Sequence, residues 1–193
     1  MTATRRLVVG ISGASGIAYG TRVLELARKA GLETHLVVTP AGQQTRAYES
    51  GLSARDLAEM ADVSYRPADV GAAIASGSFR TDGMIVAPCS ARTLSAIAYC
   101  TGDNLLTRAA DVTLKERRPL LLLVRETPLT LGHLRAMTAA TESGAIVMPP
   151  VPAFYLRPGT VDEIVGHTAG RALDLLGVDV ADLSRWGSTE STT

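Results

Sequence analysis

VVGISGASGIAYG, residues 8–20, joins an apolar run to a helical pattern through a loop of small residues. The apolar run predicts a buried strand, and the apolar spacing from Gly16 onward predicts a helix that ends at Gly31. A strand that leads into a helix through such a loop directs free N–H groups and the positive end of the helix dipole outward, which suits a phosphate. A tight turn that merely needs small side chains explains the same residues, so the motif alone leaves both interpretations open.

The spacing of the glycines argues against a dinucleotide. Gly10, Gly13 and Gly16 are spaced GxxGxxG. The dinucleotide fingerprint is GxGxxG, with an acidic residue about 20 residues further on, at the end of the second strand. Here the second predicted strand ends in Thr39-Pro40, which is also typical of a helix N-cap and first helical residue. The sequence therefore favours a mononucleotide over NAD.

The composition is that of one compact domain. The chain has 193 residues, of which 46% are hydrophobic and 20% charged. Basic and acidic residues balance at 19 each, which gives no electrostatic footprint for nucleic acid or an anionic membrane. No signal peptide or membrane-spanning run is visible, so a cytoplasmic location is expected. The 2 cysteines and 3 histidines show no ligand spacing, and we expect free thiols and no metal.

Strands alternate with helices along the chain, which predicts an α/β domain with a mostly parallel sheet covered on both faces. After the first strand, further strands are predicted at 32–39, 83–89, 119–124 and 145–150. Helices are predicted at about 40–48, 52–61, 94–100, 104–116, 131–142 and 160–176. Residues 51–80 are the least regular part, interpreted either as a loop over a site or as a surface connection.

The loops after the predicted strands contain more polar, small and charged residues than a structural turn requires. In an open parallel sheet the ligand lies beyond the carboxyl ends of the strands. Four of the five predicted ends have hydrogen-bonding groups, small residues or charge. In chain order, the five ends are GISGASG, Thr39, PCSART, Arg125-Glu126 and PPVPAFYLRP. This convergence favours a site for a phosphate and a ring at that edge.

Four motifs resemble the UbiX-type flavin prenyltransferases, within the homo-oligomeric flavin-containing Cys decarboxylase-like superfamily. They are GASG, APCSARTLSAIA, DNLLTRAADVTLKERRPLLLLVRETP and MPPVPAFY. The resemblance implies one three-layer domain over 1–187, flavodoxin-like or Rossmann-like, with 188–193 expected to be a disordered tail. It also implies a homododecamer with active sites between subunits.

The activity that the resemblance implies is transfer of a dimethylallyl group from dimethylallyl phosphate to N5 and then C6 of reduced FMN. No metal is implied. The product, prenylated FMN, serves as cofactor of a partner decarboxylase in ubiquinone biosynthesis or aromatic acid metabolism.

The resemblance also assigns residues. Those implied to bind FMN are Gly13, Ala14, Ser15, Thr39, Ser90, Ala91, Arg92, Thr93 and Arg125. Those implied to bind dimethylallyl phosphate are Tyr155 and Arg171, with Arg108, Lys115 and Glu126 on positions that build a phosphate pocket across a subunit boundary. The implied catalytic residues are Ser15 and Glu49 for the N5 proton, Lys115 for the phosphate, and Glu126 as acid or base toward the phosphate or the C6 proton.

These residue types suit the chemistry, because phosphate leaves readily from a dry pocket only when its growing charge is matched. Each also has an ordinary explanation. Lys115 is four residues from Asp111 and fits a surface ion pair, and Arg171 fits a side chain that extends along an apolar surface. Tyr155 fits a core aromatic with a solvated hydroxyl, and Glu49 fits a solvent-facing helix end.

One departure from the family concerns the substrate pocket. Some members place a Trp near the substrate, whereas the region around Val70 has only small residues, and the sole Trp is Trp186. Two other functions stay open. One is an FMN-dependent cysteine decarboxylase of the same fold, and the other is a non-catalytic flavin-binding subunit, which would have no use for Lys115, Tyr155 and Arg171.

Overall fold

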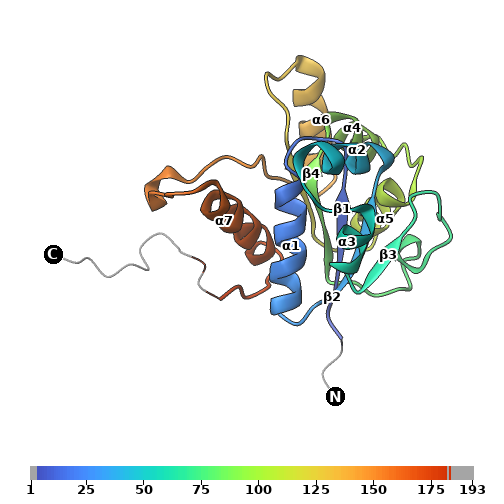
Figure 1. The fold of residues 1–193 in the computed structure, drawn as a ribbon. Helices are drawn as coiled ribbons and strands as arrows, with labels where there is room; N and C mark the ends of the chain where they lie inside the picture. The colour runs from blue at the N-terminus through green and yellow to red at the C-terminus, as the bar shows by residue number, and fades with distance from the viewer. Residues whose placement is uncertain (1–3, 182, 184–193) are drawn as a thin grey trace.

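The structure, a computed structural model, describes residues 4–181 and 183. Its centre is a six-stranded sheet in the order β3-β2-β1-β4-β5-β6, and every neighbouring pair is parallel (Figure 1). Without β3 the strands follow the flavodoxin order, and β3 extends that order to the Rossmann order. The predicted α/β class is confirmed, and the described sheet is wholly rather than mostly parallel. The predicted tail, 188–193, lies outside the described residues.

The central strands are apolar because helices cover both of their faces. All residues are buried in β4 (Gly83–Cys89) and β5 (Leu120–Val124). In β1 (Arg6–Ile11) and β2 (Glu33–Val38) only the first residue is partly exposed. The four predicted strands in this region are confirmed.

The two edge strands differ from expectation. β6 is only Ile146–Val147, within the predicted 145–150. β3 (Val63–Tyr65) lies in the segment for which no strand was predicted, between α3 (Ala54–Glu59) and the 3₁₀ turn η1 (Ala73–Ala75). Three residues are too few to show an alternating pattern, which is why the sequence did not indicate β3.

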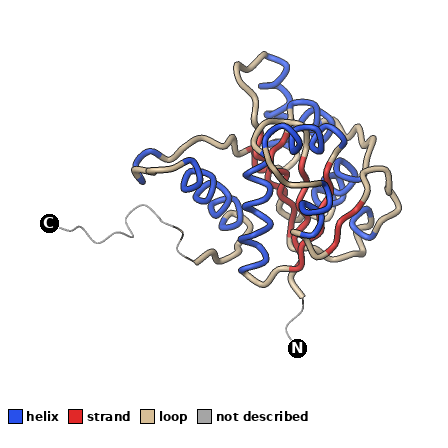
Figure 2. The backbone as a smooth tube through the Cα atoms, viewed as in Figure 1, coloured by secondary structure: helices blue, strands red, loops and turns tan. Residues whose placement is uncertain are grey.

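Helices form the two outer layers. α1 (Ile17–Lys29) and α7 (Val161–Asp174) contribute to one hydrophobic core, on one face of the sheet. α4 (Ala91–Ala98), α5 (Leu105–Lys115) and α6 (Leu131–Glu142) contribute to the core on the other face. Figure 2 shows these layers on either side of the strands. The predicted helices are confirmed, with boundaries that shift by a few residues.

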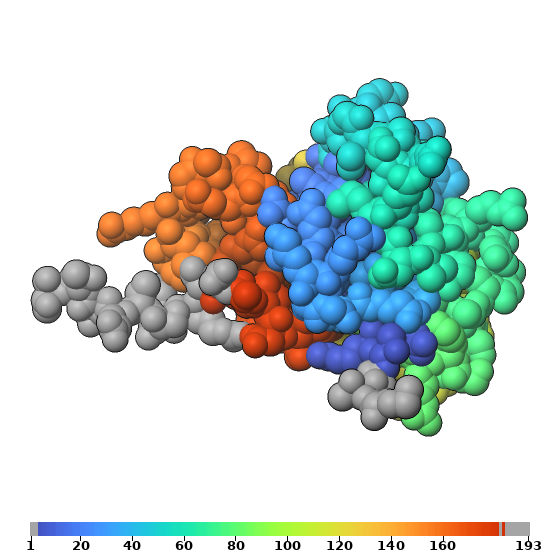
Figure 3. All heavy atoms as spheres, turned by 60° about the horizontal axis from the view of Figure 1, so that its bottom comes forward, coloured from blue at the N-terminus to red at the C-terminus, as the bar shows by residue number. Residues whose placement is uncertain are grey.

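The C-terminal part of the chain projects from the body of the molecule. α7 packs along α1, and the loop before α7 reaches outward to the 3₁₀ turn η2 (Phe154–Leu156) (Figure 1). Figure 3 shows this region, in orange, as a lobe beside the blue surface of the N-terminal residues. Val151 and Phe154 are each 73% exposed there. We call residues 150–174 the C-terminal arm.

No described helix combines the length and the apolar character needed to cross a membrane. Within the described residues, no three His, Cys, Asp or Glu side chains are grouped to hold a metal ion. Both cysteines are free thiols, as predicted. Cys89 is buried at the end of β4, and burial raises the pKa of its thiol. Cys100 is exposed, just beyond α4.

Candidate active site

The loops that follow the central strands are joined by backbone hydrogen bonds at the carboxyl edge of the sheet. Thr39 N donates to Ile11 O at 2.9 Å, which connects the ends of β2 and β1. Arg125 N donates to Cys89 O at 3.0 Å, which connects the ends of β5 and β4. Four of the five predicted loops are therefore joined in pairs at this edge, after β1 and β2 and after β4 and β5.

Small residues are required in the loop after β1. A Cβ atom added to Gly13 would lie 2.4 Å from Cβ of Ala41, so this loop and α2 (Pro40–Glu49) approach as closely as a glycine allows. Gly16 has φ of 114°, a left-handed conformation that L side chains rarely adopt. The loop thus needs small residues for geometric reasons, as the tight-turn interpretation expects.

The first amides of α1 are already bonded to a carboxylate of the same chain. Glu49 Oε2 accepts from Gly16 N at 2.8 Å and from Ile17 N at 3.0 Å. Burial alone would raise the pKa of the Glu49 carboxyl. Hydrogen bonds from Ser15 and from the two amides, with the charge of Arg125, outweigh burial and lower that pKa. Glu49 thus occupies two of the amides at the start of α1. A phosphate at the glycine loop stays a prediction.

Hydroxyl side chains cap the next two helices of this edge. Thr39 Oγ1 accepts from Gly42 N at 3.0 Å, and so it is the predicted N-cap of α2. Ser90 Oγ accepts from Thr93 N at 3.2 Å and caps α4. Thr93 is itself buried and lies with its hydroxyl 3.1 Å from that of Ser90. These caps fix the backbone of the two loops beside the glycine loop.

The charged residues of this edge are more loosely held. Arg92 pairs with Asp103 at 2.7 Å, and 83% of its side chain is exposed. Arg125 is exposed and lies near enough to Glu49 for its charge to act on that carboxyl. Glu126 Oε1 accepts from Thr127 N at 3.1 Å.

Arg108 lies near the start of α5 and Lys115 at its end. In a parallel sheet the connecting helix runs back from the carboxyl edge to the amino edge, so Lys115, at the end of α5, lies toward the amino edge. Lys115 Nζ is 2.6 Å from Glu116 Oε1, and Arg108 pairs with Asp111 at 2.7 Å. Lys115 therefore pairs with Glu116, and not with Asp111 as its ordinary explanation expected. Because Arg108 and Lys115 are separated by about two helical turns, they lie on the same side of the helix.

Tyr155 and Arg171 belong to the C-terminal arm. Tyr155 is 52% exposed, and its ring meets His167 edge-on with centroids 6.5 Å apart. His167 is one helical turn before Arg171, so the two predicted donor-binding residues lie on neighbouring parts of the arm. Arg171 forms an ion pair with Asp174. Tyr155 is thus not the core aromatic that its ordinary explanation required.

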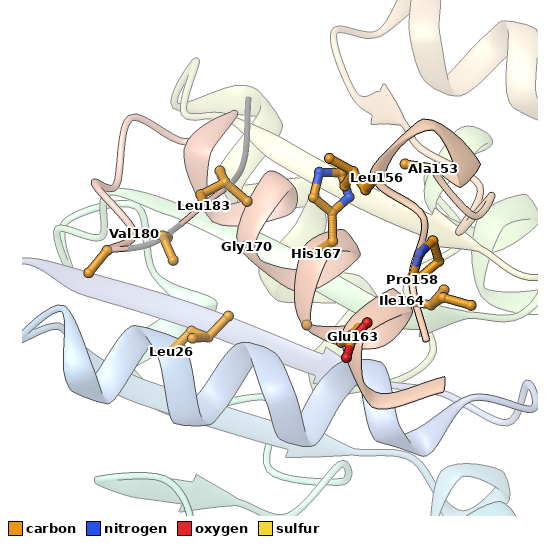
Figure 4. Close-up of a pocket in the computed structure, with 12 residues that line it drawn as sticks. Leu26, Ala153, Leu156, Pro158, Glu163, Ile164, His167, Gly170, Val180 and Leu183 are labelled. Atoms are coloured by element: carbon orange, nitrogen blue, oxygen red, sulfur yellow. The ribbon is translucent and has the colours of Figure 1, made fainter. Parts of the chain in front are cut away.

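A cavity of about 390 Å³ lies between the arm and α1 (Figure 4). Its walls are largely apolar, with Leu26, Leu156 and Ile164 among them, and with His167 and Glu163 as polar members. None of the predicted site residues lines it. The cavity does adjoin the predicted donor residues, because its lining includes His167, whose ring meets that of Tyr155, and Gly170, which precedes Arg171.

With this geometry in place, known proteins can be compared. A family model described as Flavoprotein matches residues 1–167. Flavin prenyltransferase UbiX of Neisseria meningitidis serogroup B is 54% identical over 182 residues, which are 94% of this chain and 96% of that protein. The chain belongs to the flavoprotein family, as a UbiX-type flavin prenyltransferase.

Solved structures of UbiX-type proteins share the fold of this chain. The crystal structure of AnUbiX (PadA1) in complex with FMN and dimethylallyl pyrophosphate gives a TM-score of 0.94 at 44% identity, covering 97% of this chain and all of that one. A dodecameric FMN-dependent Ubix-like decarboxylase from Escherichia coli O157:H7 gives 0.90 at 48% identity, covering 94% and 98%. The predicted family is confirmed.

For this UbiX-type chain, the described residues bring together only part of the predicted site. The residues implied to bind FMN, with Glu49, gather at the carboxyl edge. Arg108 and Lys115 lie along α5, and Tyr155 and Arg171 lie on the arm. Sequence reasoning did not single out Ser12, which bonds two of the gathered loops to each other. Its position, directly beyond a buried strand, was the available signal.

Proposed function

We propose that this chain transfers a dimethylallyl group from dimethylallyl phosphate to N5 and C6 of reduced FMN, and releases prenylated FMN. The observation that carries the proposal is a near-identical fold, over almost the whole chain, to a structure that contains both FMN and dimethylallyl pyrophosphate. The sequence also has the motifs that resemble the flavin-binding and donor-binding segments of the family.

The residues at the carboxyl edge suit a flavin. Gly13 lets the glycine loop pack closely against α2, and the capped loops beside it offer backbone donors and hydroxyls. We assign FMN binding to residues 13–15, Thr39, 90–93 and Arg125. Reduced FMN supplies a nucleophilic nitrogen and an electron-rich ring carbon when bound.

The donor side needs positive charge. As the allylic C–O bond breaks, its electron pair leaves with the phosphate, and cations lower the barrier by matching that charge. We assign this task to Lys115, Arg108 and Arg171, with Tyr155 as a hydroxyl donor. Ser15 and Glu49 take up the N5 proton as the new N–C bond forms. Glu126 is the acid or base for the phosphate or for the C6 proton.

We propose that the site requires more than one copy of the chain. Arg108 and Lys115 both lie on α5, and Lys115, at the end of that helix, lies toward the amino edge of the sheet, whereas the glycine loop lies at the carboxyl edge. We therefore propose a homo-oligomer, a dodecamer as in the Escherichia coli O157:H7 structure, in which a neighbouring subunit supplies these cations. The product would pass to a decarboxylase that uses prenylated FMN.

The test is an anaerobic incubation of the purified protein with reduced FMN and dimethylallyl phosphate, followed by mass analysis of the extracted flavin. We expect a gain of one dimethylallyl unit that is absent without protein. A parallel incubation with dimethylallyl pyrophosphate identifies the preferred donor. An unchanged mass with both donors, in protein that binds FMN, would refute the proposal and favour the cysteine decarboxylase or the flavin-binding subunit.

A further inference from the structure

Two of the loops assigned to the flavin belong to different strands. Residues 13–15 follow β1, and residues 90–93 follow β4. The ladder between β1 and β4 has its last registered pair at Gly10 and Val86, so it ends before either loop begins. Some other contact must set the distance between the two loops.

Ser12 provides that contact. Ser12 N donates to Pro88 O at 3.2 Å, and Ser12 Oγ donates to the same carbonyl at 2.9 Å. Ser90 N donates to Ser12 Oγ at 2.8 Å. The direction of the hydroxyl bonds is unambiguous, because an amide can only donate and a carbonyl can only accept. The Ser12 hydroxyl thus donates to Pro88, near the end of β4, and accepts from Ser90, directly after β4.

The same residue shapes both loops. Ala14 N donates to Ser12 O at 3.0 Å, which forms the tight turn of the glycine loop. On the other side, Ser90 is the N-cap of α4 and holds Thr93. A displacement of Ser90 would therefore move the start of α4 relative to the glycine loop.

Ser12 does not touch a ligand itself. Only 1% of its surface is exposed, and its single hydroxyl proton is already donated to Pro88 O. Without the hydroxyl, the Ser90 amide would lose its partner, and a buried unpaired donor is costly. The loops would then relax apart until that amide finds water, and a ligand that bridges them would have to draw them back.

We propose that Ser12 is a positioning residue, which holds the two flavin loops at their binding distance before the flavin arrives. This inference rests on the proposed function only in taking FMN as the ligand. It does not depend on prenyl transfer.

The test compares FMN affinities by fluorescence quenching in Ser12→Ala, Ser12→Cys and Thr113→Ala. Thr113 is a matched control because its buried hydroxyl donates to Ala109 O at 2.7 Å, within α5 and outside the flavin loops. We expect Ser12→Ala to raise the Kd for FMN roughly tenfold or more, and Thr113→Ala to leave it within about twofold. Ser12→Cys should fall between, because a thiol bonds weakly.

Equal Kd values for Ser12→Ala and wild type, with similar thermal destabilisation in Ser12→Ala and Thr113→Ala, would overturn the proposal. Amide hydrogen exchange of the wild type gives a second readout that needs no variant to fold. We expect the Ser90 amide to exchange slowly before FMN is added, and fast exchange that slows only with FMN would also overturn it. Wild-type prenyl transfer, measured separately by flavin mass, tests the proposed function alone.

Discussion

The carboxyl edge of the sheet and the donor-side residues are built in opposite ways. At the edge, loops from neighbouring strands are interlocked by hydrogen bonds through Ser12, Thr39 and Glu49. On the donor side, Lys115 and Arg171 lie on outer helices and bond to acids of their own helix or its cap. The difference agrees with the proposal that one chain sets the geometry of the flavin side, whereas the donor side is completed by a neighbouring subunit.

The acids beside the donor-side cations sharpen this contrast. Arg108, Lys115 and Arg171 each pair with an acid one to three residues further along the chain, namely Asp111, Glu116 and Asp174. In the Arg108 and Lys115 pairs both partners are at least 35% exposed, and pairs so accessible contribute only about 0 to 1 kcal/mol. On the proposed function, a phosphate would displace these two acids at little cost.

The largest expected effect comes from Lys115→Met. Removing a cation that matches the charge of the leaving phosphate should lower the rate of prenyl transfer about 100- to 1000-fold. FMN affinity should be unchanged, because Lys115 is assigned to the phosphate of the donor and not to the flavin. Flavin mass at timed intervals measures the rate, and fluorescence quenching measures the affinity.

Co-expression of Lys115→Met with Ser15→Ala tests whether the two sides come from different subunits. Mixed oligomers should regain activity that neither variant has alone, because some sites then combine an intact Ser15 with an intact Lys115. A mixture no more active than its components would show that both groups serve one chain. The proposal that a neighbouring subunit supplies Lys115 would then be wrong.

A smaller effect is expected within the interlocked edge. Gly13→Ala places a Cβ 2.4 Å from that of Ala41 and forces the loop away from α2. Such overpacking costs about 1 to 3 kcal/mol, and we expect at least a tenfold loss of FMN affinity. Gly51→Ala is the control, because its Cβ would meet no atom within 4 Å. Similar Kd values for the two variants would contradict the close approach.

The smallest effect concerns the pH dependence of Glu49. Its pKa is lowered in the folded protein, so the carboxylate stabilises the fold above its ordinary pKa, and this stabilisation is lost as the pH falls through the folded value. Glu49→Gln should lower the free energy of unfolding at neutral pH by about 0.5 kcal/mol, since the site is exposed. Urea unfolding should show that the difference disappears in acid. A difference that persists there would assign the effect to something other than charge.

The sequence predicted the central sheet well because buried parallel strands are continuous apolar runs. GMIVAPC and PLLLLV carry that signal without ambiguity. β3 was missed because its three residues gain their order from pairing with β2, including the bond between His35 Nδ1 and the Tyr65 hydroxyl. Such a strand depends on a tertiary contact that local pattern does not contain.

For the site, motifs indicated which residues matter but not which of them meet. Nothing in the spacing of Glu49 foretold that its carboxylate reaches the amides of Gly16 and Ile17. The separation of Lys115 from the glycine loop follows from the direction of α5, and it becomes visible only once the strand order is known. The roles of these residues stay predictions until the variants are measured.

The two thiols differ in exposure, so one of them can be labelled selectively. Because Cys89 is buried with a raised thiol pKa and Cys100 is exposed, the native protein should react with one equivalent of a maleimide dye. Cys100 lines the same small cavity as Arg108, so the dye would report on the surroundings of a donor-side cation without any engineered cysteine. Its emission could follow subunit assembly in real time.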